Sequence, residues 1–158
     1  MANTQAMTTS FMGELMTATH NFGTAPVRAT GATDSFKAAL YLTTATVNAS
    51  TTAYSASNEV SGTGYSAGGV AVTFGTPPTA TNSSATAGVA FVTPSASITY
   101  TTVTLATAFD AVLIYNSTQS NKAVSVHTFG SQTITAGTFT LTMPSNNTTD
   151  ALIRLATT

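Results

Sequence analysis

The glycine-rich stretch at residues 58–70 comes closest to a known chemical motif. It reads NEVSGTGYSAGGV, and its core GTGYSA, residues 62–67, matches the glycine spacing of a dinucleotide-binding turn. That turn works only between a strand and a helix, because the helix N-terminus supplies the amides that hold a pyrophosphate. Here the upstream residues are rich in Thr, Ser and Ala, and the downstream GGVAVTF alternates as a strand does. The stretch therefore predicts a backbone turn with positive φ before a strand, not a nucleotide site.

Acid–base and nucleophilic chemistry have few candidate residues. The two histidines, His20 and His127, lack the spacing of a metal site. Asp110 and His127 could join a serine in a triad, but no serine lies in a G-x-S-x-G elbow. Four of the five acids adjoin ends of predicted elements, where capping explains them better than a glycosidase or calcium site. The acids are Glu14, Asp34, Glu59, Asp110 and Asp150. We predict a protein that is not an enzyme and holds neither metal nor cofactor.

The composition predicts one mainly β domain. A length of 158 residues suits a single domain with one core. Hydrophobic residues make up 42% of the chain but charged residues only 6%, against about a quarter in ordinary domains. Because exposed helices are normally built from charged side chains, a Thr-rich and Val-rich chain with so few of them favours strands.

The charge balance bears on partners. Four Lys and Arg against five Asp and Glu give a net charge of −1, with no basic run, so we expect no binding to nucleic acid. Because the net charge is close to zero, there is little electrostatic repulsion between this protein and other proteins. Cysteine is absent, so the fold must depend on packing and on oligomerisation. The first basic residue is Arg28, and the chain contains no long apolar run. We therefore expect neither a secretory signal nor a membrane span, and we expect the protein to be synthesised in the cytoplasm.

The N-terminal segment has helical spacing. Apolar residues recur at i, i+4, i+7 and i+11 from Phe11 to Phe22, and two methionines widen the stripe. We predict a helix over 11–21 with Ser10 as N-cap, Glu14 near the positive end of the dipole and His20 in the last turn, followed by Gly23 as the left-handed exit.

Two roles are open for this segment, which we define as the arm, residues 1–23. Its apolar stripe can pack on the core of the remaining domain, residues 24–158. Alternatively it can dock on a neighbouring subunit, because Met and Phe stripes serve adaptable contacts.

Beyond the arm the hydrophobic period changes to two. In FKAALYLT, the side chains of Phe36, Ala38, Leu40 and Leu42 face one way, as a half-buried strand requires. Further predicted strands are GVAVTF, GVAFVT, SITYTTVTLA, FDAVLIYN, AVSVHTF, QTITA, GTFTLTM and ALIRLA. Eight or nine short strands separated by turn clusters predict an antiparallel β-sandwich or jelly roll. Residues 45–67 are the least regular part, and loops of that length are usually functional or ordered by a partner.

The order of several segments resembles a family of small virion proteins of tailed bacteriophages, in particular capsid decoration, or cement, proteins. The segments are SFMGELMTATHNF, DSFKAALYL, NEVSGTGYSAGG, FDAVLIYN and AVSVHTFGSQTITAGTFTLTMP, and together they cover the chain from about residue 10 to residue 155. The resemblance implies a non-enzymatic protein on the capsid exterior that binds and stabilises the shell of major capsid protein, typically as a homotrimer. The candidate contacts to the capsid or to other subunits are Phe11, Met12, Leu15, Met16, Phe22 and Tyr65.

Two other readings stay open. One is a component of the tail, neck or fibre that binds glycans through exposed aromatics such as Tyr54, Tyr65 and Tyr100. The other is a small hydrolase, because β-sandwiches host many functions.

Overall fold

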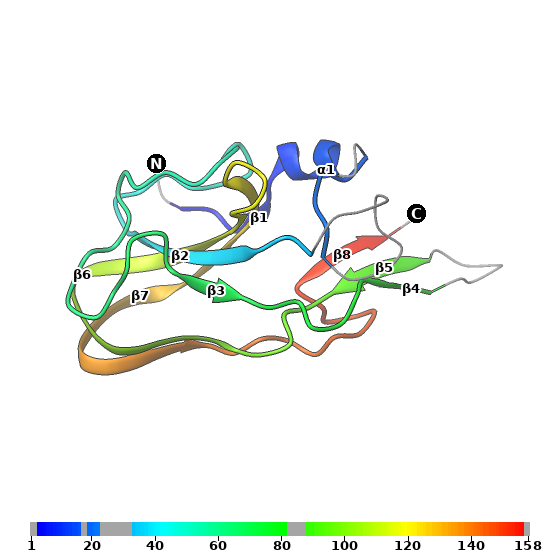
Figure 1. Cartoon of the computed structure of the whole chain (residues 1–158). Coiled ribbons are helices and arrows are strands. Elements are labelled where there is room, and N and C mark those ends of the chain that lie inside the picture. The colour runs from blue at the N-terminus through cyan, green and yellow to red at the C-terminus, as the bar shows by residue number, and fades with distance from the viewer. Residues whose placement is uncertain (1–2, 17–18, 23–32, 82–87, 157–158) are drawn as a thin grey trace.

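The chain folds into two antiparallel sheets and one short helix. A computed structural model describes residues 3–16, 19–22, 33–81 and 88–156, and the account below concerns these residues. Figure 1 shows the larger sheet on the left, the smaller sheet on the right and the helix above their junction. The predicted fold class, a mainly β antiparallel sandwich with one short N-terminal helix, is confirmed.

The larger sheet has five strands in the order β1-β7-β6-β2-β3. In chain order these are β1 (Ala6–Met7), β2 (Phe36–Leu42), β3 (Val70–Val72), β6 (Ile98–Asn116) and β7 (Lys122–Leu141). The smaller sheet has the order β4-β5-β8 and is formed by β4 (Thr79–Ala80), β5 (Val89–Val92) and β8 (Ile153–Ala156). All strand pairs are antiparallel, and β6 and β7 are joined directly by the short turn at residues 117–121.

Strands β6 and β7 are longer than we predicted. The sequence pattern divided them into five short strands, whereas the structure has one continuous hairpin in which the register shifts at several bulges. Thr102 and Ala136 have positive φ of 53° and 45° within these strands. A bulge bends a strand without ending it. The hairpin can therefore change direction at its bulges, whereas the five separate strands that we predicted would need turns between them.

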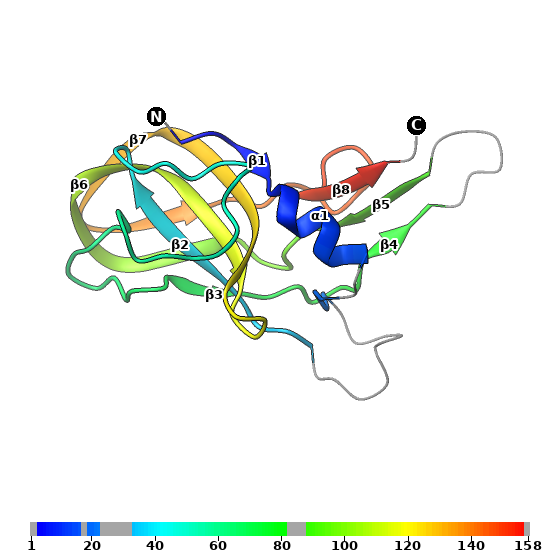
Figure 2. The ribbon, with the colours of Figure 1, turned by 90° about the horizontal axis from the view of Figure 1, so that it is seen from above.

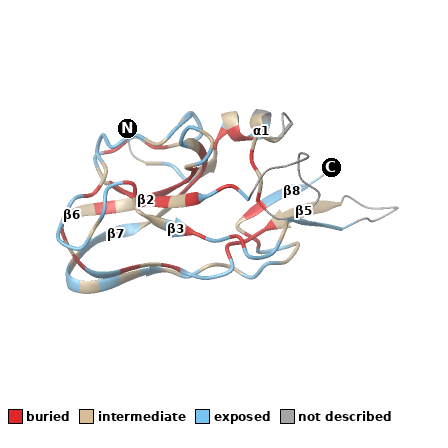
Figure 3. Ribbon diagram, in the orientation of Figure 1, coloured by how far each residue is buried: buried red, intermediate tan, exposed pale blue. Residues whose placement is uncertain are grey.

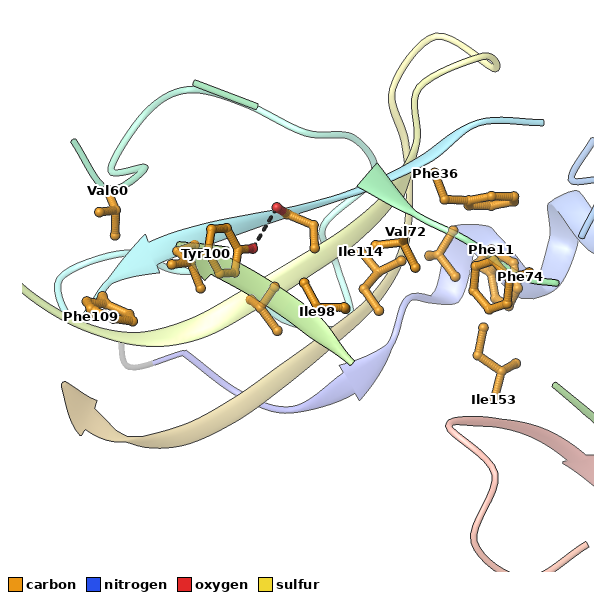
Figure 4. Close-up of a cluster of buried hydrophobic side chains, with 14 of the residues drawn as sticks. Phe11, Phe36, Val60, Val72, Phe74, Ile98, Tyr100, Phe109, Ile114 and Ile153 are labelled. Atoms are coloured by element: carbon orange, nitrogen blue, oxygen red, sulfur yellow. Dashed lines mark hydrogen bonds between the residues drawn. The ribbon is translucent and has the colours of Figure 1, made fainter. Parts of the chain in front are cut away.

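The main core lies between β2 and the folded-over hairpin. Tyr100, near the start of β6, is 2% exposed, and its hydroxyl donates to the carbonyl of Ala38 in β2 at 2.7 Å (Figure 4). Phe109 and Val60 close one end of this core, and Phe11, Phe36, Phe74 and Ile153 form the other. Buried aromatic side chains contribute much of the energy of such a core.

A second apolar cluster covers the opposite face of the larger sheet. Ala39 and Tyr41 of β2 are as buried as Ala38 and Leu40, because residues 43–58 lie over them. The prediction that β2 is half-buried is therefore wrong. Figure 3 shows buried segments along the middle of β2 and exposed residues along much of β7. The irregular segment is thus ordered by its own sheet.

The helix α1 (Thr9–Met16) is shorter than the predicted span of 11–21. Ser10 lies inside it and not at the N-cap. The residue before the helix is Thr8, whose hydroxyl donates to carbonyls of β7 at 3.2 and 3.3 Å. The helix ends at Met16, and beyond it the amide of Thr19 donates to the carbonyl of Glu14 at 2.9 Å. The predicted exit at Gly23 lies outside the described residues.

Candidate interaction site

The two phenylalanines of the arm lie in the main core. Phe11 is fully buried and Phe22 is 6% exposed. The ring of Phe22 stacks on Phe36 with centroids 4.6 Å apart and meets Phe74 edge-on at 4.9 Å. Within this chain, therefore, these side chains follow the first of the two roles left open, packing on the core.

A small apolar hollow lies between the helix and the smaller sheet. Figure 2, seen from above, shows α1 between the larger sheet and strands β8, β5 and β4. The hollow has a volume of about 60 Å³. It is lined by Phe11, Leu15, Phe22, Pro78, Ala90, Phe91, Val92, Ile153 and Leu155. Every one of these side chains is apolar, so the hollow suits an apolar group and not a polar ligand.

Two large apolar side chains are exposed on the elements that line this hollow. Met12 on α1 is 46% exposed, and Leu155 on β8, at the rim, is 40% exposed. Leu15 is partly buried against the core. Met16 ends α1, and its side chain lies outside the described residues. We define Met12, Leu15, Phe91 and Leu155, with the hollow, as the apolar patch.

A polar network fastens the arm to the larger sheet. Nε2 of His20 lies 2.7 Å from a carboxylate oxygen of Glu14, and the other oxygen accepts from Nζ of Lys122. On the opposite side of the ring, Nδ1 of His20 lies 3.1 Å from Nδ2 of Asn116. The same amide nitrogen donates to Asp34 at 2.7 Å. His20, Asp34 and Asn116 are all buried, and buried polar groups of this kind require such partners.

The ionisation of this network follows from burial and from its hydrogen bonds. Burial lowers the pKa of His20 below its ordinary value, although the carboxylates of Glu14 and Asp34 act in the opposite direction. Burial raises the pKa of Glu14, but hydrogen bonds from Lys122 and His20 outweigh this effect and lower the pKa. Near neutral pH the network therefore contains a neutral imidazole beside an ionised Glu14.

Tyr65 is used internally. Its hydroxyl donates to Glu59 at 2.7 Å and accepts from the amide of Leu40 at 3.0 Å. The amide of Gly68 donates to the same carboxylate oxygen of Glu59 at 2.7 Å, and the hydroxyl of Tyr54 donates to the other oxygen at 2.6 Å. Burial and the adjacent Glu59 carboxylate raise the pKa of Tyr65. One carboxylate thus holds together the irregular segment and the glycine-rich turn.

The tyrosines proposed as a glycan platform are not freely exposed. Tyr100 is 2% exposed. The rings of Tyr65 and Tyr100 stack with centroids 5.8 Å apart, and Tyr54 stacks on Tyr115 at 4.7 Å. The predicted exposure of Tyr100 is therefore wrong, whereas Tyr54 and Tyr65 are partly exposed. An aromatic platform for a sugar needs an open ring face.

The glycine-rich turn packs against backbone of its own chain. A Cβ at Gly62 would lie 2.1 Å from the carbonyl oxygen of Thr104, and one at Gly69 would lie 1.6 Å from that of Ala38. Gly64 and Gly69 have positive φ of 78° and 71°. The glycines therefore allow close approach to β6 and β2, which agrees with the predicted turn before a strand.

The carboxylates that could do chemistry are all held by internal hydrogen bonds. Besides Glu14, Asp34 and Glu59, already described, Asp110 accepts from Nδ2 of Asn3 and Asp150 from Nδ2 of Asn147. These bonds give each acid a structural partner.

The triad considered from the sequence is not assembled. Nε2 of His127 lies 2.9 Å from Oγ of Ser125, but Asp110 bonds to Asn3. Among the described residues, no carboxylate is hydrogen-bonded to His127. Burial lowers the pKa of His127 to about 4, so the imidazole is neutral at pH 7. Ser125 is 3% exposed, which leaves its hydroxyl poorly placed to meet a substrate.

Comparisons with known proteins give no relative: the chain matches no family model, no curated protein and no solved structure. In the described ranges, no helix is long and apolar enough to cross a membrane.

Sequence reasoning missed Leu155, Phe91 and the buried network of His20. Leu155 lies in a predicted strand, but the period of two places it on the same face as the buried Ile153, so alternation predicts burial and not the exposure that the structure shows. The network joins residues more than 80 positions apart and has no local signature.

Proposed function

We propose that this chain is a non-enzymatic structural protein of a tailed-phage virion, a decoration protein that binds the major capsid protein on the outside of the shell as a homotrimer. The observation that carries the proposal is the apolar patch: Leu155 is exposed at a hollow lined by apolar side chains alone, and Met12 is exposed on α1, the helix that supplies Phe11 and Leu15 to that lining. Contact sites for other proteins are often contiguous apolar surfaces, and we infer that the apolar patch is the centre of such a site. The resemblance of the ordered segments to decoration proteins gives the class of partner.

The structure changes which part of the arm makes the contact in this proposal. Phe11 and Phe22 stabilise the chain's own core, whereas Met12 is available on the outer side of the same helix. A methionine adapts to the shape of its partner. Charged residues make up only 6% of the chain, so few charges need to be desolvated in an apolar contact.

Charge insertion into the apolar patch tests the proposal. The double variant Met12→Lys, Leu155→Lys introduces two cations that apolar contact would have to desolvate. We expect it to fold, as judged by circular dichroism, but to lose co-sedimentation with shells of the major capsid protein from the same virus. Thr138→Lys, at an exposed position of β7, is the matched control and should attach as the wild type does.

Salt dependence gives a second readout of the same binding. Attachment through apolar contacts should change little between low and moderate salt, whereas binding to phosphates would fall steeply. Full attachment of the double lysine variant would contradict the proposed contact, and failure of the wild-type chain to bind shells at any salt concentration would contradict the function.

A further inference from the structure

The His20 network joins parts of the chain that are far apart in sequence. Glu14 belongs to α1, His20 follows the helix, Asp34 precedes β2 and Asn116 ends β6. Lys122 begins β7 and completes the network at Glu14. The polar attachment of the helix to the larger sheet therefore has two branches: the direct ion pair of Glu14 with Lys122, and the path from Glu14 through the imidazole ring of His20 to Asn116.

Asn116 fixes the protonation state that this ring must have. Its Oδ1 accepts from the amides of Thr118 and Gln119, both at 3.1 Å, so the side-chain amide cannot turn over without losing two hydrogen bonds. Its NH₂ group must then face Nδ1 of His20 and the carboxylate of Asp34. An NH₂ group only donates, so Nδ1 must accept and the proton of the neutral ring lies on Nε2, toward Glu14.

A second proton on the ring would oppose this arrangement. With a proton on Nδ1, two donors would face each other across 3.1 Å, and the bond to Asn116 would be lost. The charged groups around the ring are Glu14 from α1, Asp34 from the segment before β2 and Lys122 from β7. The rings of Phe11 and Phe22 lie 4.9 and 6.2 Å from the imidazole and supply no hydrogen bond.

We propose that this network is a proton-operated latch: when His20 takes up a second proton, its bond to Asn116 breaks, and α1 with residues 19–22 detaches from a sheet that stays folded. Detachment exposes Phe11 and Phe22 together with the aromatic surface of Phe36 and Phe74 that they cover. Acid thus converts the closed state, in which α1 is attached to the sheet, into an open state that presents a larger apolar surface. This inference does not depend on the proposed function.

The sign of the effect follows from linkage. Burial lowers the pKa of His20 in the closed state, so the released ring binds a proton more readily than the latched ring. The latch is fully stable above about pH 6.5, the value for a free histidine, and weakens as pH falls toward the closed-state pKa. Within that window one proton raises the opening constant by about tenfold per pH unit. Protonation of Glu14, whose pKa is also lowered, adds to the opening at more acid pH.

Hydrogen exchange of the full chain tests the latch. Protection factors, corrected for intrinsic exchange rates, are measured for amides of α1 and of β6 and β7 between pH 7.5 and 4.5. We expect protection in α1 to fall by about tenfold per pH unit below pH 6.5 while the strands remain protected. Equal protection in α1 and in the strands across this pH range, which would mean that α1 opens only when the whole domain unfolds, would overturn the proposal.

Two variants test whether His20 is the residue that makes the protection of α1 depend on pH. His20→Gln keeps a donor and an acceptor but takes up no proton in this range, so the fall in α1 protection between pH 6.5 and 4.5 should disappear. His127→Gln removes the other histidine and should leave that fall in place. An unchanged pH dependence in His20→Gln would overturn the latch.

A measurement on the wild-type chain covers the case in which His20→Gln does not fold. Nitrogen chemical shifts of the imidazole report which ring atom carries the proton. We expect an unprotonated Nδ1 at pH 7.5 that becomes protonated over the same pH range in which α1 opens. A proton on Nδ1 at pH 7.5 would overturn the proposal.

Discussion

Phe11 and Met12 are neighbours on one helix, and the structure gives them opposite environments. Phe11 is 0% exposed and packs in the main core, whereas Met12 is 46% exposed. Truncation of a buried phenylalanine to alanine costs about 3–5 kcal/mol, through lost burial and the cavity left behind. Surface substitutions usually change stability by no more than about 0.5 kcal/mol. We therefore expect Phe11→Ala to destabilise the chain severely and Met12→Ala to leave stability almost unchanged.

Urea unfolding followed by circular dichroism measures this difference. With a slope of about 2 kcal/mol per molar urea, the midpoint of Phe11→Ala should fall by about 1.5–2.5 M relative to Met12→Ala. Such a loss is a large part of the about 5–15 kcal/mol that stabilises a domain. Equal midpoints for the two variants would refute the placement of Phe11 in the core and return the arm to the docking role.

Three further predictions concern the turn, the buried carboxylate and the second histidine. Gly69→Ala places a Cβ against the carbonyl of Ala38 at positive φ and should lower the unfolding free energy by more than about 1 kcal/mol, whereas Gly130→Ala, with open space around it, should not. Glu59→Gln weakens three hydrogen bonds and should cost about 1–3 kcal/mol in urea titrations, with faster amide exchange over residues 54–69; unchanged exchange there would contradict this role. Because the pKa of His127 is lowered to about 4 from the ordinary 6.5, the unfolding free energy should fall as pH drops from 6.5 to 4, and His127→Gln should reduce that dependence to the part that His20 contributes.

The sequence pattern predicted the types of element better than their limits. Alternation placed β2 and the strands of the β6–β7 hairpin, and the apolar stripe placed α1. Strand β6 was divided wrongly at Thr107-Ala108, between SITYTTVTLA and FDAVLIYN, although these two residues include no Gly, Pro or Asn. A strand that bends through bulges interrupts the period of two just as a turn does, so the absence of turn residues was the signal that separated the two cases.

The polar contacts could not be predicted, because their partners come together only in the folded chain. Glu59 adjoins the glycine-rich turn, but nothing in its neighbourhood shows that Tyr54 and Tyr65 converge on its carboxylate. His20 was expected at a helix end, whereas a shorter helix leaves it free to reach Asn116 at the end of β6. Burial of β2 on both faces likewise depends on where residues 43–58 cross the sheet.

The copy number of this chain in purified virus particles tests the central proposal most directly. Quantitative mass spectrometry of intact virions, with the major capsid protein as internal standard, measures it without any variant. A decoration protein of the shell should be present in numbers comparable to those of the major capsid protein. A copy number close to that of tail or neck proteins, or absence from the particle, would contradict the account.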